Sequence, residues 1–338
     1  MIGIVAPSSG VAALCPRRFL RGLAHLEELG FTPVVGDTAT AQSHIGYTSA
    51  TPQERADDLN RMFADSRINA IMTTIGGTAA NHILDHLDVD VIASNPKFLI
   101  GYSDVTLLHA ALWQRVGLTS ISGPALLPQF GEPDGPHRFT QENFLRVVAT
   151  SVPPGRIVPS GVVLEGVRHW DLDDDLKRVE APAPAPLVHA EGLGHGWLAP
   201  LNIESLLALS GTDWYPDLSG ALLVLEAAET TSAARFHQGL HQLKAQHVFQ
   251  TLAGLLIGRF DTRSQCPPDL VSCIVDDVLG KPDFPVVSGI DFGHTDPLLS
   301  LPWGVAAEIS ATSGEDFMFA ILEAAGSSPG DVNVGEAS

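Results

Sequence analysis

A serine, a glutamate and a histidine each stand just after an apolar run of strand type. Ser103 follows Phe98–Ile100, Glu226 follows Ala221–Leu225, and His294 follows Val286–Ile290. A histidine beside a serine hydroxyl can take its proton, and a carboxylate can hold the imidazole in the required tautomer. The carboxyl ends of parallel strands meet at one edge of a sheet, so these side chains could form a nucleophilic site. Spacing alone does not single out His294 among 13 histidines, and a structural role for it stays open.

The surroundings of Ser103 fit a nucleophile and also fit a simpler role. Ser103 lies between a strand-like run and the helical run Val105–Val116, so its hydroxyl is expected on a sharp turn. The backbone N–H of Asp104 would lie at the helix N-terminus, where a developing oxyanion is stabilised. Ser103 or Asp104 could equally serve as a helix cap. Val105 replaces the second glycine of the G-x-S-x-G motif, which is therefore incomplete.

Two further features of the sequence could form sites. Gly76 and Gly77 follow the apolar run Ala70–Thr74, and such a pair can supply an oxyanion donor or form a plain turn. Two histidine pairs are spaced four apart, His82 with His86 and His237 with His241. Neither pair has the glutamate of an H-E-x-x-H zinc motif, so we predict no metal and no cofactor.

Composition narrows the class of protein. The 338 residues suffice for two domains, and 45% hydrophobic with 17% charged residues indicates a globular chain. A formal charge of −20 argues against nucleic acid or an anionic membrane as partner. The three cysteines have no paired spacing, which favours reduced thiols in the cytoplasm. We expect no signal peptide and no spanning helix, because no basic leader or long apolar run is present.

The order of the expected elements predicts an α/β protein. Strand-like and helical runs alternate in the first half, and the pattern resumes in the second half, which indicates mostly parallel sheets. The helix expected at Pro52–Ala64 has a capping box in Thr51 and Glu54. We predict an N-terminal α/β domain at 1–150, a linker region at 151–190, a smaller C-terminal α/β domain at 191–325, and a disordered tail at 326–338. The Ala-Pro tract at 181–186 is expected to be an extended spacer.

In combination, several ordered segments of the chain resemble the LD-carboxypeptidase family of serine peptidases. The matching segments spread over most of the sequence and include Met72-Thr73-Thr74-Ile75-Gly76-Gly77, Gly101-Tyr102-Ser103-Asp104, Gly123-Pro124-Ala125-Leu126, Leu225-Glu226 and Gly293-His294-Thr295. The resemblance is closest to the microcin C immunity branch of this family. Each segment alone is weak evidence for the family, but the combination of these segments in this order along the chain is specific to it.

This resemblance implies roles for several residues. It implies a Ser103–His294–Glu226 triad, an oxyanion hole from the backbone N–H groups of Gly77 and Asp104, and an active site between two domains. It also implies a homodimer.

Within the immunity branch the implied reaction is cleavage of the amide-type bond that joins an aminoacyl or peptidyl group to a nucleotide. Gly76, Trp170 and Asn202 would bind the substrate, with Trp170 stacking on the base or serving as an ordinary half-buried side chain. Ala199-Pro200-Leu201 replaces glycines that this branch has before Asn202. Two alternatives stay open: an LD-carboxypeptidase acting on murein tetrapeptides, and a non-catalytic protein that sequesters nucleotide conjugates.

Overall fold

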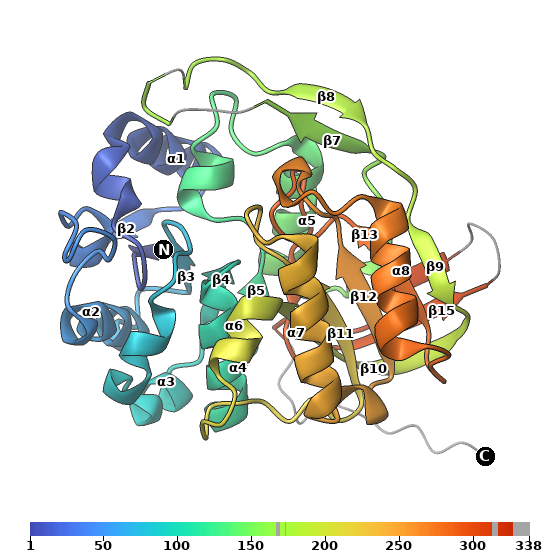
Figure 1. Cartoon of the computed structure of the whole chain (residues 1–338). Helices are drawn as coiled ribbons and strands as arrows, with labels where there is room; N and C mark the ends of the chain where they lie inside the picture. The colour runs from blue at the N-terminus through green and yellow to red at the C-terminus, as the bar shows by residue number, and fades with distance from the viewer. Residues whose placement is uncertain (167–169, 173, 313–316, 327–338) are drawn as a thin grey trace.

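The expected α/β fold is confirmed. A computed structural model describes residues 1–166, 170–172, 174–312 and 317–326, and Figure 1 shows two sheets side by side, each with helices packed on it. Apart from Gly326, the tail predicted to be disordered lies outside the described residues, so that prediction is untested. Within the described part of the chain, no helix is both long and apolar enough to cross a bilayer.

The N-terminal sheet has six strands in the order β14-β5-β4-β3-β1-β2. Their bounds are Ile2–Val5 (β1), Pro33–Val35 (β2), Ala70–Thr73 (β3), Phe98–Gly101 (β4), Ile121–Ser122 (β5) and Leu301–Pro302 (β14). All neighbours are parallel except β14, which comes from the C-terminal half and pairs antiparallel with β5. The two halves of the chain therefore share this sheet.

Helices and short turns connect these strands. The α-helices are Pro16–Glu28 (α1), Pro52–Ala64 (α2), Val89–Ser94 (α3), Val105–Val116 (α4) and Arg138–Val148 (α5). The shorter helical turns are Val11–Leu14 (η1), Asp37–Ala39 (η2), Ala80–His86 (η3) and Leu126–Phe130 (η4). The bounds predicted for α2 are confirmed, and both hydrogen bonds of its capping box are present. A helix is also expected from the sequence near 79–86, and η3 forms there with the tighter 3₁₀ geometry.

The C-terminal sheet has eight strands in the order β6-β16-β15-β10-β11-β12-β13-β9. Their bounds are Gly155–Ile157 (β6), Leu187–Ala190 (β9), Gly192–Asn202 (β10), Ala221–Glu226 (β11), Gly254–Gly258 (β12), Val286–Ile290 (β13), Ala306–Ala311 (β15) and Phe317–Ile321 (β16). Strands β10 to β13 are parallel, and the others pair antiparallel. The helices and turns of this half are Ile203–Ala208 (α6), Ala233–Ala245 (α7), Val248–Gln250 (η5), Thr262–Ser264 (η6) and Pro268–Leu279 (α8).

The segment predicted as a linker contains more regular structure than expected. Strands β7 (Val162–Glu165) and β8 (Val179–Pro182) form a separate two-stranded sheet, seen at the top of Figure 1. Strands β6 and β9, also within 151–190, are the two edges of the C-terminal sheet. Of the tract at 181–186 that was predicted to be an extended spacer, Ala181 and Pro182 belong to β8, and only 183–186 lie outside regular secondary structure. The domain boundaries themselves stay a prediction.

One apolar core passes through both halves of the chain. Leu107 and Leu108 of α4 belong to the same buried cluster as Ile203 and Leu206 of α6, and this cluster continues beneath α7 and α8. A second cluster covers the other face of the C-terminal sheet, and a third lies between the N-terminal sheet and α1 and α5. The edge where the two sheets meet is thus fixed by packing from both sides.

Candidate active site

A large cavity lies where the loops after the parallel strands of both sheets converge. Its volume is about 1410 Å³, and Gly76, Gly77, Ser103 and His294 are on its wall. These residues come from both halves of the chain. The cavity is therefore built as expected for parallel α/β sheets, at the carboxyl ends of the strands.

Ser103 occupies the sharp turn between β4 and α4. Its φ of +62° is in the left-handed region, which costs a residue with a side chain about 1–2 kcal/mol. The turn is held from behind, because Thr106 and Ser205 donate hydrogen bonds to the Ser103 carbonyl oxygen over 2.7 and 3.2 Å. In this conformation Ser103 lies on the cavity wall.

His294 links the serine to a buried carboxylate. Its Nε2 lies 3.0 Å from the Ser103 hydroxyl oxygen, and its Nδ1 lies 2.6 Å from Oε2 of Glu226. Glu226 ends β11 and is 1% exposed, so its charge is held in a largely dry environment. The three strand-end side chains that the sequence singled out are thus brought together in one hydrogen-bonding row.

Gly293 makes room for this row. Its φ is +105°, and a Cβ atom there would lie 2.6 Å from Cβ of Glu226. A side chain at this position would therefore push Glu226 or His294 out of place. The loop after β13 brings the imidazole over the carboxylate only because this residue is a glycine.

The glycine loop after β3 lies directly against the nucleophile. A Cβ atom on Gly76 would be 3.1 Å from the Ser103 hydroxyl oxygen and 3.3 Å from the Asp104 nitrogen. The Asp104 carboxylate anchors the same loop, since it accepts hydrogen bonds of 2.8 Å from the backbone nitrogens of Ala79 and Ala80. This arrangement places the backbone of the loop beside the hydroxyl. The oxyanion role of Gly77 and Asp104 stays a prediction.

Asn202 takes a different place from the one predicted for a substrate-binding residue. It is 3% exposed and does not contribute to the cavity wall. Its Nδ2 donates to Oε1 of Glu226 over 2.9 Å, and its Oδ1 accepts from the Ser205 nitrogen over 3.0 Å as the N-cap of α6. These contacts favour a positioning role, in which Asn202 fixes the carboxylate that faces His294.

Trp170 lies on the cavity wall, as expected for a ring that contacts a ligand. The guanidinium carbon of Arg18 lies 4.5 Å from the ring centroid, so a cation covers one face of the indole. Arg18 is fully buried and bonded to the carboxylates of Asp174 and Glu132. This network fixes the guanidinium and, through it, the position of the indole.

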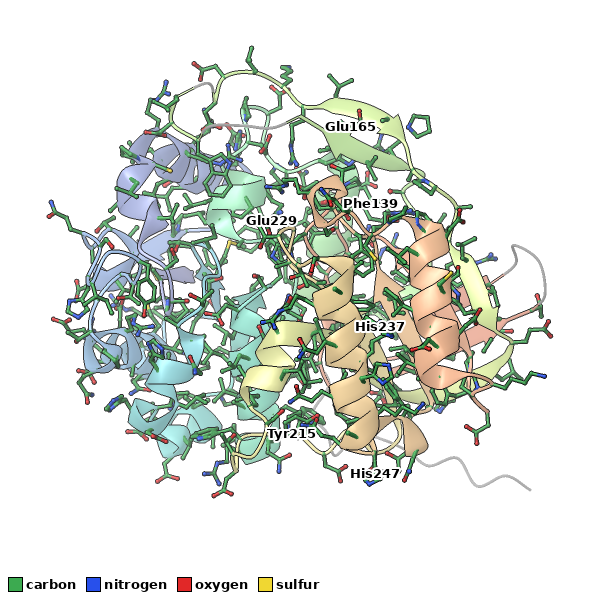
Figure 2. All side chains as sticks on the ribbon, viewed as in Figure 1. Phe139, Glu165, Tyr215, Glu229, His237 and His247 are labelled. Atoms are coloured by element: carbon green, nitrogen blue, oxygen red, sulfur yellow. The ribbon has the colours of Figure 1, made fainter. Side chains whose placement is uncertain are left out.

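Two neighbours of His294 were not singled out from the sequence. Glu229 follows Glu226 by three residues, and its Oε2 lies 3.5 Å from Nε2 of His294; Figure 2 shows it where the two halves meet. The ring of Tyr102 meets the imidazole edge-on with centroids 5.1 Å apart. Tyr102 directly precedes Ser103 and Glu229 lies three residues after Glu226, and this nearness in sequence was the available signal.

The electrostatic environment favours a charged His294. Burial alone would lower its pKa, but the charge and hydrogen bond of Glu226, with Glu229 and Glu204 adding to them, raise the pKa from 6.5 to about 9. A buried carboxylate beside an imidazole stabilises the imidazolium in this way. The row is therefore suited to holding a proton taken from the serine.

Comparisons with known proteins identify the family of the chain. Models of the LD-carboxypeptidase N-terminal and C-terminal domains match residues 2–123 and 195–309. YocD of Bacillus subtilis strain 168 is 31% identical over 313 residues, covering 93% of this chain and 94% of YocD. The microcin C7 self-immunity protein MccF of Escherichia coli is 32% identical over 317 residues, covering 91% and 90%. A protein of Bacillus subtilis named as a probable murein peptide carboxypeptidase is 26% identical over 315 residues, covering 91% and 88%.

Solved structures show the same fold. An MccF-like protein from Bacillus anthracis str. Ames superposes with a TM-score of 0.88 at 28% identity, covering 95% of this chain and 96% of that one. MccF in complex with aspartyl sulfamoyl adenosine gives a TM-score of 0.84 at 29% identity, covering 95% of each chain. With the two family models matching most of the sequence, the chain belongs to the LD-carboxypeptidase family of serine peptidases.

Proposed function

We propose that this chain is a serine hydrolase that cleaves the amide-type bond between an aminoacyl or peptidyl group and a nucleotide. The observation that carries the proposal is the row from the buried Glu226 carboxylate through His294 to the Ser103 hydroxyl, with separations of 2.6 and 3.0 Å. Such a row converts a weakly nucleophilic hydroxyl into one that can attack a carbonyl. The biological result would be immunity to nucleotide-peptide antibiotics.

The chemistry follows from the proposed roles. Neutral His294 accepts the Ser103 proton while the hydroxyl oxygen attacks the carbonyl carbon of the substrate. Backbone N–H groups of Gly77 and Asp104 stabilise the oxyanion. His294 then gives its proton to the leaving nitrogen, and an acyl-enzyme remains. Water attacks this ester with His294 again as base, which releases the acid and restores Ser103.

The nucleotide part of the proposal rests on Trp170 and on relatives. The indole lies on the cavity wall with the Arg18 guanidinium over its ring, and an aromatic ring on the wall could stack on a planar group of the substrate. A similar protein, MccF, has been solved with aspartyl sulfamoyl adenosine bound. Stacking on a base would supply about 1–3 kcal/mol.

Murein tetrapeptides are the second candidate substrate. A relative named as a probable murein peptide carboxypeptidase aligns over most of this chain, and the cavity is large enough for a peptide. Parallel assays with an aminoacyl-sulfamoyl adenosine and a murein tetrapeptide, read by mass spectrometry, separate the candidates. Faster cleavage of the tetrapeptide would refute the nucleotide proposal, and return of both compounds uncut would indicate a sequestering protein.

Ala199-Pro200-Leu201 replaces glycines that the immunity branch has before Asn202. This replacement gives little support to the third candidate, a non-catalytic protein that sequesters nucleotide conjugates. Ala199, Pro200 and Leu201 lie in β10 and do not line the cavity. The Pro200 carbonyl accepts hydrogen bonds from Ser122 over 3.0 Å and from Trp303 over 3.1 Å, so this segment joins the two halves. The homodimer and the cytoplasmic location stay predictions.

Removing the Trp170 ring should weaken nucleotide substrates selectively. We expect Trp170→Ala to raise KM for the aminoacyl-sulfamoyl adenosine by about 5- to 150-fold, the equivalent of ~1–3 kcal/mol of lost stacking. Trp214 is a matched control, because Arg115 lies 4.6 Å from its ring centroid but neither residue is on the cavity wall. Steady-state kinetics with Trp214→Ala should give an unchanged KM. Equal KM values for Trp170→Ala and wild type would remove the stacking role.

The rate should rise with pH into the alkaline range. His294 must be neutral to accept the serine proton, and its pKa is raised to about 9, so kcat/KM should increase as pH rises through about 9. The same shift contributes folding stability that is present below pH ~6.5 and lost as pH passes about 9. A pH–rate profile checks this expectation, and a limb near the ordinary imidazole value would contradict it.

Glu229 provides the corresponding variant. Because its charge helps to raise the pKa of His294, Glu229→Gln should move the limb of the pH–rate profile to lower pH. Glu165, labelled with Glu229 in Figure 2, also lines the cavity but does not contribute to this pKa. Glu165→Gln should therefore leave the limb in place. A limb that moves equally in both variants would show a general field effect rather than the contact with His294.

A further inference from the structure

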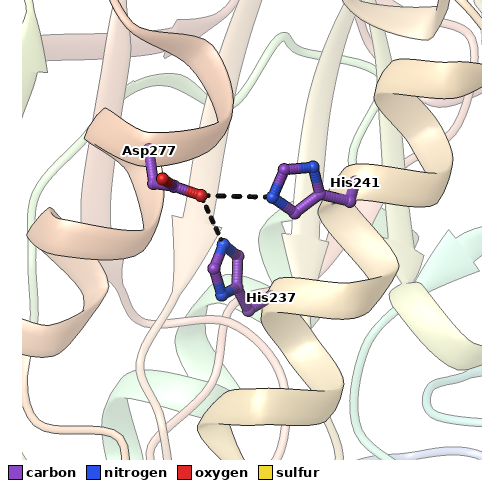
Figure 3. Close-up of side chains that lie close together, drawn as sticks. All are labelled: His237, His241 and Asp277. Atoms are coloured by element: carbon purple, nitrogen blue, oxygen red, sulfur yellow. Dashed lines mark hydrogen bonds and ion pairs between the residues drawn. The ribbon is translucent and has the colours of Figure 1, made fainter.

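A side-chain cluster outside the substrate cavity joins two helices of the C-terminal half. Nε2 of His237 and Nε2 of His241, both on α7, lie 2.9 and 3.1 Å from the same oxygen, Oδ2 of Asp277 on α8. Figure 3 shows the two rings and the carboxylate converging from the two helices. None of the three lines the substrate cavity. We propose that His237, His241 and Asp277 form a binding site for a divalent transition-metal ion, with Zn²⁺ as the best-suited ion.

The three side chains match what Zn²⁺ requires. Two imidazole nitrogens and one carboxylate oxygen are a common protein ligand set, with water as the fourth ligand. Bonds of ~2.0–2.2 Å in a tetrahedral arrangement place the ligand atoms about 3.3–3.6 Å from one another. The observed N···O separations of 2.9 and 3.1 Å are already close to that value, and all three ligand atoms lie within 4.8 Å of one another. Small side-chain rotations would therefore admit the ion.

The backbones that carry the ligands are fixed. Phe236 and Leu240, next to the two histidines, are fully buried, and so is Val278, next to Asp277. Lys244 also donates a hydrogen bond of 2.5 Å to the Val278 carbonyl oxygen. Packing of α7 on α8 thus holds the backbones of the three ligands in place before an ion binds. Less conformational entropy is then lost on binding, which favours affinity.

The cluster is open to solvent. The side chains of His237, His241 and Asp277 are 36%, 50% and 60% exposed, so an ion and its water can reach them. Imidazole prefers Zn²⁺ and neighbouring transition metals, whereas Mg²⁺ prefers all-oxygen sites.

The other histidine pair shows why helix geometry matters. His82 and His86 are also four apart, but they lie in the 3₁₀ turn η3, where residues three apart are aligned. Among the described residues they form no candidate ligand group, whereas His237 and His241 sit one above the other on an α-helix. The third ligand, Asp277, comes from a separate helix and could not be assigned from the sequence.

Titration of the full chain with Zn²⁺ after chelator treatment tests the proposal. Calorimetry should show one ion per chain, and the unfolding temperature should rise with Zn²⁺ but not with Mg²⁺. His237→Gln, His241→Gln and Asp277→Asn should each weaken Zn²⁺ binding by about tenfold or more. His86→Gln is the matched surface control and should bind like wild type.

The nearby thiol must be tested separately. Cys273 is exposed and precedes Asp277 by one helical turn on α8, so Cys273→Ser should keep wild-type affinity. Absence of saturable Zn²⁺ binding, or binding that the three ligand variants do not weaken, would overturn the proposal. Loss of binding in Cys273→Ser would overturn it as well, because the thiol would then be the ligand. Hydrolysis should continue in the presence of chelator, which separates this site from the triad.

Discussion

Ser103→Ala should reduce hydrolysis by about 10⁶-fold while the protein remains folded, since loss of a triad serine removes nearly all of the activity that the triad supplies. The hydroxyl oxygen lies 3.0 Å from Nε2 of His294, and among the described residues no other serine forms a hydrogen bond with that ring. Single-turnover measurements with an aminoacyl-sulfamoyl adenosine, read by mass spectrometry, give the rate. Circular dichroism checks the fold.

Two variants make this result specific. Ser103→Gly also lacks the hydroxyl but suits the left-handed φ of +62°, so it should be inactive and at least as stable as Ser103→Ala. Ser288 lines the same cavity and bonds His189 instead of His294, so Ser288→Ala should keep activity within a few-fold of wild type. Wild-type rates in Ser103→Ala, or in Ser103→Gly, would disprove the assignment of the nucleophile.

Glu226→Gln should be the second most damaging change, with a loss of about 10⁴-fold in kcat, the order found when a triad carboxylate becomes an amide. Both Glu226 oxygens accept hydrogen bonds, Oε2 beside Nδ1 of His294 and Oε1 from Nδ2 of Asn202. A glutamine has only one acceptor oxygen, so its amide group must face one of two donors. The imidazole then loses either its orientation or its compensating charge. Steady-state kinetics at several pH values measures the loss.

The pH dependence distinguishes a positioning defect from a lost charge. Glu226 is a principal cause of the raised pKa of His294, so Glu226→Gln should move the pH–rate limb toward lower pH as well as lower its height. Asn202→Ala removes the donor to Oε1 but keeps the carboxylate, so it should reduce kcat less. A Glu226→Gln enzyme with an unchanged limb and only a small loss in rate would contradict the proposed row.

Much of the site's location follows from the sequence, because parallel strands carry their loops to a shared edge. Ser103, Glu226 and His294 each follow an apolar run, and the structure places Ser103 and His294 on loops beside Glu226, the last residue of β11. The role of Asn202 could not be predicted in the same way. Its partner Glu226 is 24 residues away, and only the parallel register of β10 against β11 brings the two side chains together.

Strand β10 could not be predicted from the sequence because its composition is unfavourable for a strand. Gly192, Gly194, Gly196 and Pro200 are residue types that strands avoid. The pairing explains how Pro200 is tolerated. Strand β10 pairs with β15 only up to Trp197 and with β11 only from Trp197 onward, so Pro200 has a ladder partner on one side alone. A missing N–H is tolerated where no neighbouring strand needs it.

The apolar cluster that continues from α4 into α6 has a consequence for how the protein loses activity on heating. The same buried cluster supports the turn that carries Ser103 and the C-terminal half of the chain. Heating should therefore unfold the two halves together rather than separate two folded halves. Inactivation and melting would then be a single event, with no long-lived open form for a protease to attack. A chain cleaved between the two halves would expose apolar surface on both fragments. These fragments would aggregate faster than they reassociate.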